Sequence, residues 1–311
     1  MFVIGIDAGG TKTVCQLADR DGRILAEARG PGANLQHAGA AQVERVLQHV
    51  IGEVSTGVGQ APAVVCLGMA GVDRAADQAV VRAILSRVAP RSQVVVVNDA
   101  LIALEAGLPG APGVVVIAGT GSIAYGRNRD GRAARAGGWG PLLGDEGSGY
   151  WMGRQALRAV VRAADGRGPY TQLTARVLTH FGVARSQDLV RAIYHGTVEP
   201  ATVAAIAPHV EAAAAQSDEI ALSLIDTGAR ELGLAALSVC HALRLSHGPV
   251  ILAGGMFNAA PRLRQRVAAH LTGRWPSMVV RPLHGEPTAG AVSLALAAAG
   301  DSLVLPTYLD D

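Results

Sequence analysis

Short apolar runs alternate with longer amphipathic stretches through the first hundred residues of the chain. Apolar runs rich in β-branched residues are typical of buried strands, whereas apolar residues spaced three and four apart are typical of helices. The pattern predicts the order β-β-β-α-β-α-β. Strands are expected near residues 2–7, 13–19, 23–29, 63–67 and 93–97, and helices near residues 39–55 and 74–88.

A glycine- and proline-rich loop at residues 107–113 separates this region from a second one, and we interpret it as a domain junction. A second β-β-β run begins after the loop. Three to five helices are expected between residues 147 and 245. The alternation of strands and helices predicts an α/β fold with two domains. The last predicted elements are a strand at 249–253, a helix near 260–271, a strand at 278–281 and a helix from about residue 287.

A short pattern occurs twice at the same offset. Gly10-Thr11 precedes Arg20-Asp21-Gly22-Arg23, and 109 residues later Gly119-Thr120 precedes Arg129-Asp130-Gly131-Arg132. Each copy follows an apolar run, which predicts strand, glycine-rich turn, strand, Asp-Gly hairpin and strand. The pattern indicates an internal duplication; two unrelated hairpins are the alternative, because Asp-Gly turns are common. Two such turns facing one another could hold a polyphosphate from both sides through backbone N–H and Thr hydroxyl groups.

Composition limits the classes of function. With 311 residues, 50% of them hydrophobic, the chain can bury the cores of two domains. A net charge of +2 with 17% charged residues provides no basic stripe of the kind that nucleic-acid binding needs. We therefore expect no nucleic-acid partner.

The cysteines and the apolar segments predict the localisation. Cys15, Cys66 and Cys240 lie far apart in apolar stretches and form no Cys-x-x-Cys pair, so reduced, buried thiols in a cytoplasmic protein are expected. The chain opens on a strand pattern rather than on a secretory signal. Residues 289–299, the most apolar late segment, are too few to span a bilayer, so no membrane partner is expected.

The first of four candidate ligand loops covers residues 7–13, at the end of the first predicted strand. Strand ends are where α/β folds gather ligands. Asp7 closes the strand, and Gly9 and Gly10 permit close approach of the backbone. Lys12 supplies a cation that can meet a phosphate. It is the only lysine of the chain, which hints at a role, although an incidental loop lysine is the alternative.

The second loop holds Asn98 and Asp99, directly after the strand predicted near 93–97. A carboxylate here, with a helix starting at Ala100, can act as a general base toward a hydroxyl. Asp is also a frequent helix N-cap, and the local sequence leaves both roles open. The third loop, residues 118–122, repeats the first without an acid or a base, which suits phosphate binding through N–H and hydroxyl donors.

The fourth loop, residues 137–151, combines dense glycines with two tryptophans and two acids. Such glycine density costs stability, and the mixture suits a sugar site, where acids bind hydroxyls and a flat ring lies beside the pyranose. We expect Asp145 to contact a ligand rather than to cap the helix starting near residue 147, and Trp151 to pack in the core. Further on, Gly254 and Gly255 end a strand where they can pass against a flat purine ring.

The order of these motifs resembles the N-acetylglucosamine kinase branch of the BadF/BadG/BcrA/BcrD ATPase family, which belongs to the actin-like, Hsp70 and sugar kinase superfamily. The resemblance covers nearly the whole chain, and its most specific part runs from Gly138-Trp139-Gly140 to Gly144-Asp145-Glu146-Gly147-Ser148. It implies two ribonuclease H-like domains with an interdomain cleft. The first would be residues 1–112 with a closing helix at 290–311, and the second residues 113–289 with helical insertions.

The resemblance also implies roles for single residues. The phosphates of ATP would be held from one side by Thr11 with its flanking glycines and Lys12, and from the other by Thr120. The remaining nucleotide contacts would come from Ala214, Gly254, Gly255 and Asn258. The amino sugar would face Asn34, Asp99, Ser122, Gly138, Trp139, Gly140 and Asp145. Asp7 is expected to reach Mg²⁺ through water, because this ion keeps much of its hydration shell.

The reaction implied is phosphoryl transfer from ATP to O6 of N-acetylglucosamine in a cytoplasmic homodimer, with Asp99 as the base. Glucosamine or N-acetylmuramic acid is an alternative substrate. The ATPase activators of acyl-CoA dehydratase and reductase systems, in the same family, are a rival; they bridge an iron–sulfur cluster with exposed cysteines, and none of the three cysteines lies in a suitable loop. A sugar sensor fused to a DNA-binding domain is a further rival; we expect no such domain here, and Asp99 is present.

Overall fold

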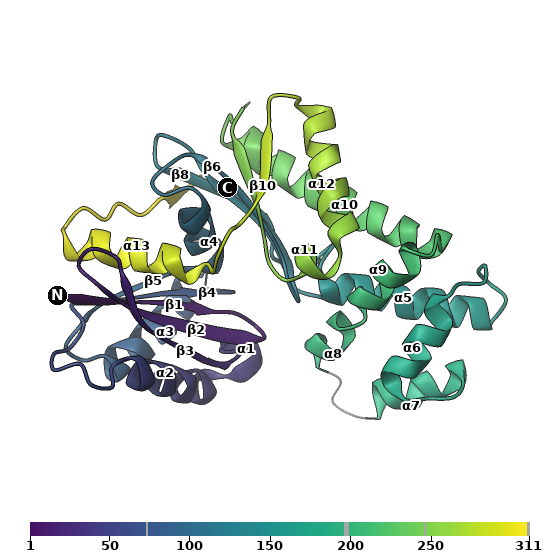
Figure 1. The fold of residues 1–311 in the computed structure, drawn as a ribbon, viewed down its shortest axis with the longest axis horizontal. Coiled ribbons are helices and arrows are strands. Elements are labelled where there is room, and N and C mark those ends of the chain that lie inside the picture. The colour runs from purple at the N-terminus through teal and green to yellow at the C-terminus, as the bar shows by residue number, and fades with distance from the viewer. Residues whose placement is uncertain (73, 196–198, 246, 310–311) are drawn as a thin grey trace. The chain divides into compact units, whose positions relative to one another are not determined.

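The computed structural model describes residues 1–72, 74–195, 199–245 and 247–309 (Figure 1). The chain divides into two compact units. Unit 1 comprises residues 1–115, 125–134 and 282–311, and unit 2 comprises residues 116–124 and 135–281. The domain limits expected from the sequence stay a prediction.

Unit 1 is built on a five-stranded sheet in the order β3-β2-β1-β4-β5. Strands β1 to β3 pair antiparallel, and β4 and β5 join β1 in parallel. Valine and isoleucine dominate the central strands, as expected of strands covered on both faces. The strand bounds are Phe2–Ala8 for β1, Lys12–Asp19 for β2, Ile24–Pro31 for β3, Val64–Met69 for β4 and Gln93–Asn98 for β5.

Helices cover both faces of this sheet (Figure 1). On one face, Ile4 and Ile6 join the core formed with α2 and α3. On the other face, Gly5 leaves room for α13, since a Cβ there would lie 2.5 Å from the backbone N of Val292. The helix bounds are Leu35–Ala38 for α1, Ala40–Val54 for α2, Ala75–Val88 for α3, Asp99–Gly107 for α4 and Thr288–Ala299 for α13.

A second, six-stranded sheet has the order β10-β9-β6-β7-β8-β11. Without its edge strand β11, this order repeats the first sheet, with β8, β7, β6, β9 and β10 in the places of β3, β2, β1, β4 and β5. The predicted α/β class and the duplication of the strand order are therefore confirmed. The bounds are Gly113–Ala118 for β6, Ser122–Arg127 for β7, Arg132–Gly137 for β8, Pro249–Ala253 for β9, Val279–Pro282 for β10 and Thr307–Tyr308 for β11.

The two Asp-Gly hairpins have the same pattern of side-chain hydrogen bonds. In the first, Asp19 Oδ1 accepts from the backbone N–H groups of residues 21 and 23, both at 3.0 Å. In the second, Asn128 Oδ1 accepts from residues 130 and 132 at 3.0 and 2.9 Å. Gly22 and Gly131 follow with φ of 82° and 71°, in the left-handed region that favours glycine. The duplication thus extends to individual side-chain contacts.

The helical part of unit 2 has more elements than expected. Six α-helices lie between residues 147 and 245 in the described part of the chain, against an expected three to five. A proline is the first residue of the short helix α8 and the second residue of α9, so the boundaries of these helices are not signalled by apolar periodicity. The bounds are Gly149–Ala164 for α5, Leu173–Phe181 for α6, Ser186–Asp188 for the 3₁₀ helix η1, Leu189–Tyr194 for α7, Pro200–Ala204 for α8, Ala207–Ala214 for α9, Glu219–Ala242 for α10, Met256–Ala259 for α11 and Pro261–Arg274 for α12.

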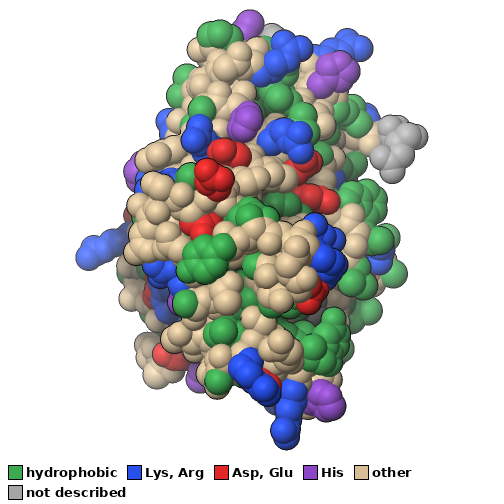
Figure 2. Space-filling view, turned by 90° about the vertical axis from the view of Figure 1, so that its right-hand side faces the viewer, with side chains coloured by type: hydrophobic (Ala, Val, Ile, Leu, Met, Phe, Trp, Pro, Cys, Tyr) green, Lys and Arg blue, Asp and Glu red, His purple; other side chains and the backbone are tan. Residues whose placement is uncertain are grey.

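Charged side chains of both signs are interspersed on the face shown in Figure 2. The three cysteines are buried, as expected. In the described residues, none of the helices is long and apolar enough to cross a membrane.

Candidate functional site

The first Gly-Thr turn links β1 to β2 in unit 1 and is packed against the loop that follows β3. Gly9 N–H donates to the carbonyl of Lys12 at 3.0 Å, and its own carbonyl accepts from Ala33 at 3.1 Å. A Cβ on Gly32 would lie 2.2 Å from the carbonyl oxygen of Gly10, so only glycine permits this approach. The turn is therefore held by backbone contacts, while Thr11 is exposed at its tip.

Asp7 lies half-buried near the end of β1, beside this turn. Burial raises the pKa of Asp7 to about 6; the ammonium of Lys12 opposes the rise and the carboxylate of Glu286 adds to it. A nearby cation stabilises the charged form of a desolvated carboxylate of this kind. The residues fit the expected Mg²⁺, which proteins commonly hold with one or two carboxylates plus waters and substrate phosphates. In the described residues there is no cluster of three or more His, Cys, Asp or Glu side chains that would cage a metal without such phosphates.

Asp99 lies at the same edge of the sheet as Asp7. The register pairs Ala8 with Met69 and Met69 with Asn98, so the ends of β1 and β5 are two strand spacings apart, about 10 Å. The N-cap of α4 is Asn98, whose side chain accepts from the N–H of Ala100 at 2.7 Å. Asp99 is the first residue of the helix and is half-buried. The structure thus assigns the N-cap contact to Asn98, and the base role expected for Asp99 stays a prediction.

The second Gly-Thr turn, in unit 2, is hydrogen-bonded to the N-terminus of α5. Gly149 and Tyr150, at the N-terminus of α5, donate their N–H groups to the carbonyls of Gly119 and Thr120 at 2.8 and 3.2 Å. The N-cap of α5 is Ser148, whose Oγ accepts from the N–H of Trp151 at 3.1 Å. These contacts join the third predicted loop to the fourth.

Asp145 lies directly beside this turn. A Cβ on Gly121 would be 2.7 Å from Oδ2 of Asp145, so the carboxylate rests against the bare Cα of the glycine. Asp145 is 7% exposed and has a φ of 59°, a conformation that non-glycine residues rarely adopt. Such strain persists where the surroundings enforce it, and it clusters at functional sites. Because Ser148 provides the N-cap, the expectation that Asp145 does not cap α5 agrees with the structure.

Ser122 and Gly138 tie the fourth loop to β7. Ser122 Oγ donates to the carbonyl of Glu146 at 2.9 Å, and Gly138 N–H donates to the carbonyl of Ser122 at 2.9 Å. Gly140 has a φ of 84°, and a Cβ there would meet nothing within 4 Å. Five of the predicted sugar-site residues therefore lie close together in unit 2: Ser122, Gly138, Trp139, Gly140 and Asp145.

The two tryptophans of the fourth loop differ in exposure. Trp151 is 6% exposed, in the core as expected. Trp139 is 60% exposed, and the guanidinium of Arg135 lies 5.0 Å from its ring centroid. An exposed ring ordered by a cation–π contact is available to stack on a ligand.

The nucleotide residues predicted in unit 2 are distributed unevenly. Gly254, with a φ of 102°, approaches the end of β6 so closely that a Cβ would lie 2.3 Å from the carbonyl oxygen of Ala118. Gly255 has open space around it, and Asn258 is exposed in α11. Ala214 is 4% exposed at the end of α9, so its methyl group packs in the core and the ligand contact expected for it is the weakest of the set.

Asn34 has a structural task in unit 1. Its side chain accepts from the N–H of Gln36 at 2.9 Å as the N-cap of α1, and donates to the carbonyl of Ala70 at 3.2 Å. These contacts join two loops next to the first turn. A role toward the sugar stays a prediction.

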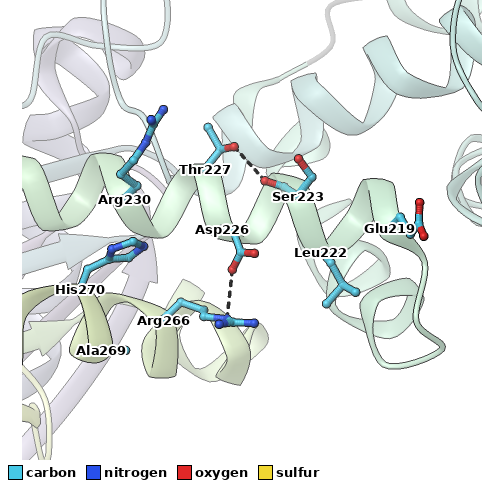
Figure 3. Close-up of a pocket in the computed structure, with 9 residues that line it drawn as sticks. All are labelled: Glu219, Leu222, Ser223, Asp226, Thr227, Arg230, Arg266, Ala269 and His270. Carbon is cyan, nitrogen blue, oxygen red and sulfur yellow. Dashed lines mark hydrogen bonds and ion pairs between the residues drawn. The ribbon is translucent and has the colours of Figure 1, made fainter. Parts of the chain in front are cut away.

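A groove of about 750 Å³ lies between α10 and α12, away from all motif residues (Figure 3). Asp226 and Arg266 form an ion pair across it at 3.0 Å. None of the predicted site residues lines it.

No local sequence pattern marks Glu286 as a neighbour of the first turn. Its carboxylate accepts from Nζ of Lys12 at 2.8 Å and from both terminal nitrogens of Arg29 at 3.3 Å. Burial alone would raise the pKa of Glu286, but the hydrogen bonds and charges of Lys12 and Arg29 hold it below its ordinary value. The contact joins residues 274 positions apart, which local patterns cannot reveal. The one signal in the sequence was that the single lysine of the chain lies in this turn.

Comparison with known proteins finds similar proteins over nearly the whole chain. Residues 4–295 match the model of the BadF/BadG/BcrA/BcrD ATPase family. The N-acetylmuramic acid/N-acetylglucosamine kinase of Clostridium acetobutylicum is 35% identical over 94% of this chain and 98% of its own. The N-acetyl-D-glucosamine kinase of Dictyostelium discoideum is 33% identical over 94% of this chain and 97% of its own.

A solved structure with a similar fold comes from Chromobacterium violaceum, where it is described as a candidate N-acetylglucosamine kinase. Its TM-score is 0.77 and its sequence is 31% identical, covering 95% of this chain and 98% of that one. With 95% of this chain covered, the similarity extends over both sheets and the helices between β8 and β9.

Proposed function

Because the chain belongs to the BadF/BadG/BcrA/BcrD ATPase family, we propose that it is an ATP-dependent amino-sugar kinase that phosphorylates N-acetylglucosamine at O6. The names of the two curated relatives support the reaction and the substrate class. The observation that carries the chemistry is the position of Asp99, a half-buried carboxylate at the end of β5. Asn98 provides the N-cap of α4, and the strand register places the end of β5 at the same sheet edge as the end of β1, where Asp7 lies.

In the proposed reaction, Asp99 accepts the proton of the sugar hydroxyl while the hydroxyl oxygen attacks the γ-phosphorus of ATP. A new O–P bond forms, the bond to the β,γ-bridging oxygen breaks, and ADP leaves. Thr11 and the N–H groups of its turn bind the terminal phosphates, and Thr120 is assigned the same task in unit 2. Binding at both turns stays a prediction.

Asp7 is the residue that would hold Mg²⁺, through water. The ion would neutralise charge on the phosphates when bound. The half-buried position of the Asp7 carboxylate beside the first turn supports this role. Asp145 and Trp139 are assigned to the sugar, the first as a hydrogen-bond acceptor for hydroxyls and the second as a stacking surface.

The experiment is a coupled ADP-release assay with a panel of sugars. The panel holds N-acetylglucosamine, glucosamine, N-acetylmannosamine, N-acetylmuramic acid and glucose, and ¹H–³¹P coupling in the product identifies the phosphorylated oxygen. N-acetylglucosamine is expected to give the highest kcat/KM, with the phosphate on O6. ATP hydrolysis that no sugar stimulates would contradict the proposal.

N-acetylmuramic acid is a second candidate substrate, because the relative from Clostridium acetobutylicum is named for both sugars. The rival activity, an iron–sulfur ATPase activator, is disfavoured by the burial of Cys15, Cys66 and Cys240. An iron assay on anaerobically purified protein tests that rival. A homodimer and a cytoplasmic location stay predictions, and light scattering tests the first.

A further inference from the structure

The only lysine of the chain is held by a carboxylate. Lys12 Nζ donates to both oxygens of Glu286, at 2.8 and 3.1 Å. Arg29 donates to Oε1 of Glu286 at 3.3 Å, and its Nε donates to Glu27 at 2.9 Å. The ammonium of Lys12 is thus fixed by Glu286, and Glu286 is fixed in turn by Arg29.

Glu286 lies just before helix α13, which packs closely against α4. It directly precedes Pro287 and α13, and its carbonyl accepts from the N–H of Ala289 at 3.2 Å. A Cβ on Gly290 would lie 1.9 Å from the carbonyl oxygen of Ile102, so α13 and α4 are in backbone contact. The backbone of Glu286 is therefore held next to a closely packed helix, and Arg29 holds its carboxylate, so that Glu286 can anchor a flexible side chain.

We propose that Glu286 is a positioning residue that holds the Lys12 ammonium beside the Gly9–Thr11 turn and leaves one of its N–H donors for the terminal phosphates of ATP. An ammonium has three N–H donors, and Glu286 engages two of them. An exposed lysine loses rotamer freedom when it binds an anion, and a lysine already fixed loses less. This inference rests on the proposed function of the first turn as a phosphate site.

A matched control exists in the same unit. Glu44 and Arg87 form an ion pair at 2.7 Å between α2 and α3, away from the motif residues. Their side chains are 26% and 56% exposed, against 29% and 54% for Glu286 and Lys12. Glu44→Gln therefore removes an ion pair of similar exposure without touching Lys12.

The first test is kinetic. Glu286→Gln should raise KM for ATP about five- to tenfold, the scale of one partly exposed charged contact, and leave KM for the sugar within about twofold. Lys12→Met should have a similar effect, and the double variant should be no worse than either single one. Glu286→Asp, which keeps the charge on a shorter side chain, should fall between wild type and Glu286→Gln. Glu44→Gln should match wild type.

The second test observes the lysine directly. With ¹⁵N in the lysine side chain, the protein gives one Nζ signal, because Lys12 is the only lysine. That signal should report a restrained ammonium in the wild type and in Glu44→Gln, and a mobile one in Glu286→Gln. Inorganic tripolyphosphate should shift the signal in the wild type, and should restrain it again in Glu286→Gln at higher concentration.

The outcomes separate the two proposals. Equal Nζ mobility in wild type and Glu286→Gln would overturn the positioning role, as would additive effects of Lys12→Met and Glu286→Gln on KM for ATP. If the wild type phosphorylates no sugar, the proposed function fails, while the Nζ signal with tripolyphosphate still decides whether Glu286 holds a phosphate-binding lysine.

Discussion

The two Gly-Thr turns occupy equivalent places in the duplicated strand order, but each is contacted by a carboxylate in a different way. At an offset of 109 residues, Lys12 corresponds to Gly121 and Asp7 to Val116. In the first turn, Glu286 grips the charged side chain of Lys12. In the second, Asp145 lies against the bare Cα of Gly121. The comparison indicates that the first copy carries a charged pair at its turn, whereas the second permits close approach of a buried carboxylate to the backbone.

The largest effect is expected at Asp99, on the side of the first copy. Asp99→Asn should lower kcat on the order of 10²-fold or more with little change in KM for ATP, because the base is lost while the shape is kept. Steady-state kinetics measures this, and the thermal midpoint checks the fold. A variant with near-normal kcat would remove Asp99 from the reaction.

The next effect is expected at Asp145, which lies beside the second turn and to which we assign sugar binding. Asp145→Asn should raise KM for the sugar about tenfold or more and KM for ATP far less, since a charged hydrogen bond is worth about 1.5–3 kcal/mol. Asn tolerates the φ of 59°, so backbone strain is not a confounding factor. Equal changes in both constants would mean that Asp145 supports the turn rather than the sugar.

Only the first copy should contribute a pH dependence of stability through its strand-end acid. Burial raises the pKa of Asp7 to about 6, above its value in the unfolded chain. The folded state therefore binds the extra proton, and the resulting stability is present below about pH 4 and is lost as pH rises through about 6. Asp7→Asn has no carboxylate to titrate, so without ligands it should not lose this stability as pH rises. The difference in unfolding free energy between Asp7→Asn and wild type should therefore shift in favour of the variant by about 2 kcal/mol from pH 4 to pH 8.

Urea unfolding of both proteins between pH 4 and 8 measures this difference. Parallel stability curves for wild type and Asp7→Asn would show that Asp7 titrates alike in the folded and unfolded chains.

The smallest effect tests where the two copies are alike. Asp19→Ala and Asn128→Ala each remove a side-chain oxygen that accepts two backbone N–H groups in the Asp-Gly hairpins. Each should cost about 1 kcal/mol of unfolding free energy, and the two costs should agree within about 0.5 kcal/mol. A clear difference between them would show that the hairpins have diverged in energy despite equal geometry.

Most strands and helices of both sheets could be predicted from the sequence, because apolar period and turn residues are local signals. The short helices between α5 and α10 could not, since α8 and α9 have a proline at their first or second residue and no amphipathic repeat. The family was predicted from the order of its motifs and is confirmed by the match over residues 4–295.

The site was less accessible from the sequence. The motifs gave Asp7, Asp99 and Asp145 as candidates, but not their geometry. The positive φ of Asp145 and the N-cap role of Asn98 are visible only in three dimensions. The pairing of Lys12 with Glu286 depends on the path of the whole chain, so no window of sequence could reveal it.

The packing of α13 has a consequence for biosynthesis. Residues 282–311 belong to the same compact unit as residues 1–115, and α13 covers the sheet face that Gly5 leaves bare. A ribosome adds about 5–20 residues per second, so roughly 15 to 60 seconds separate the synthesis of β1 from that of α13. During this interval the nascent sheet exposes an apolar face that a chaperone can shield. Lys12 gains its counter-ion only when the residues around Glu286 emerge, so the proposed phosphate-binding lysine is set in place by a segment translated 274 residues after it.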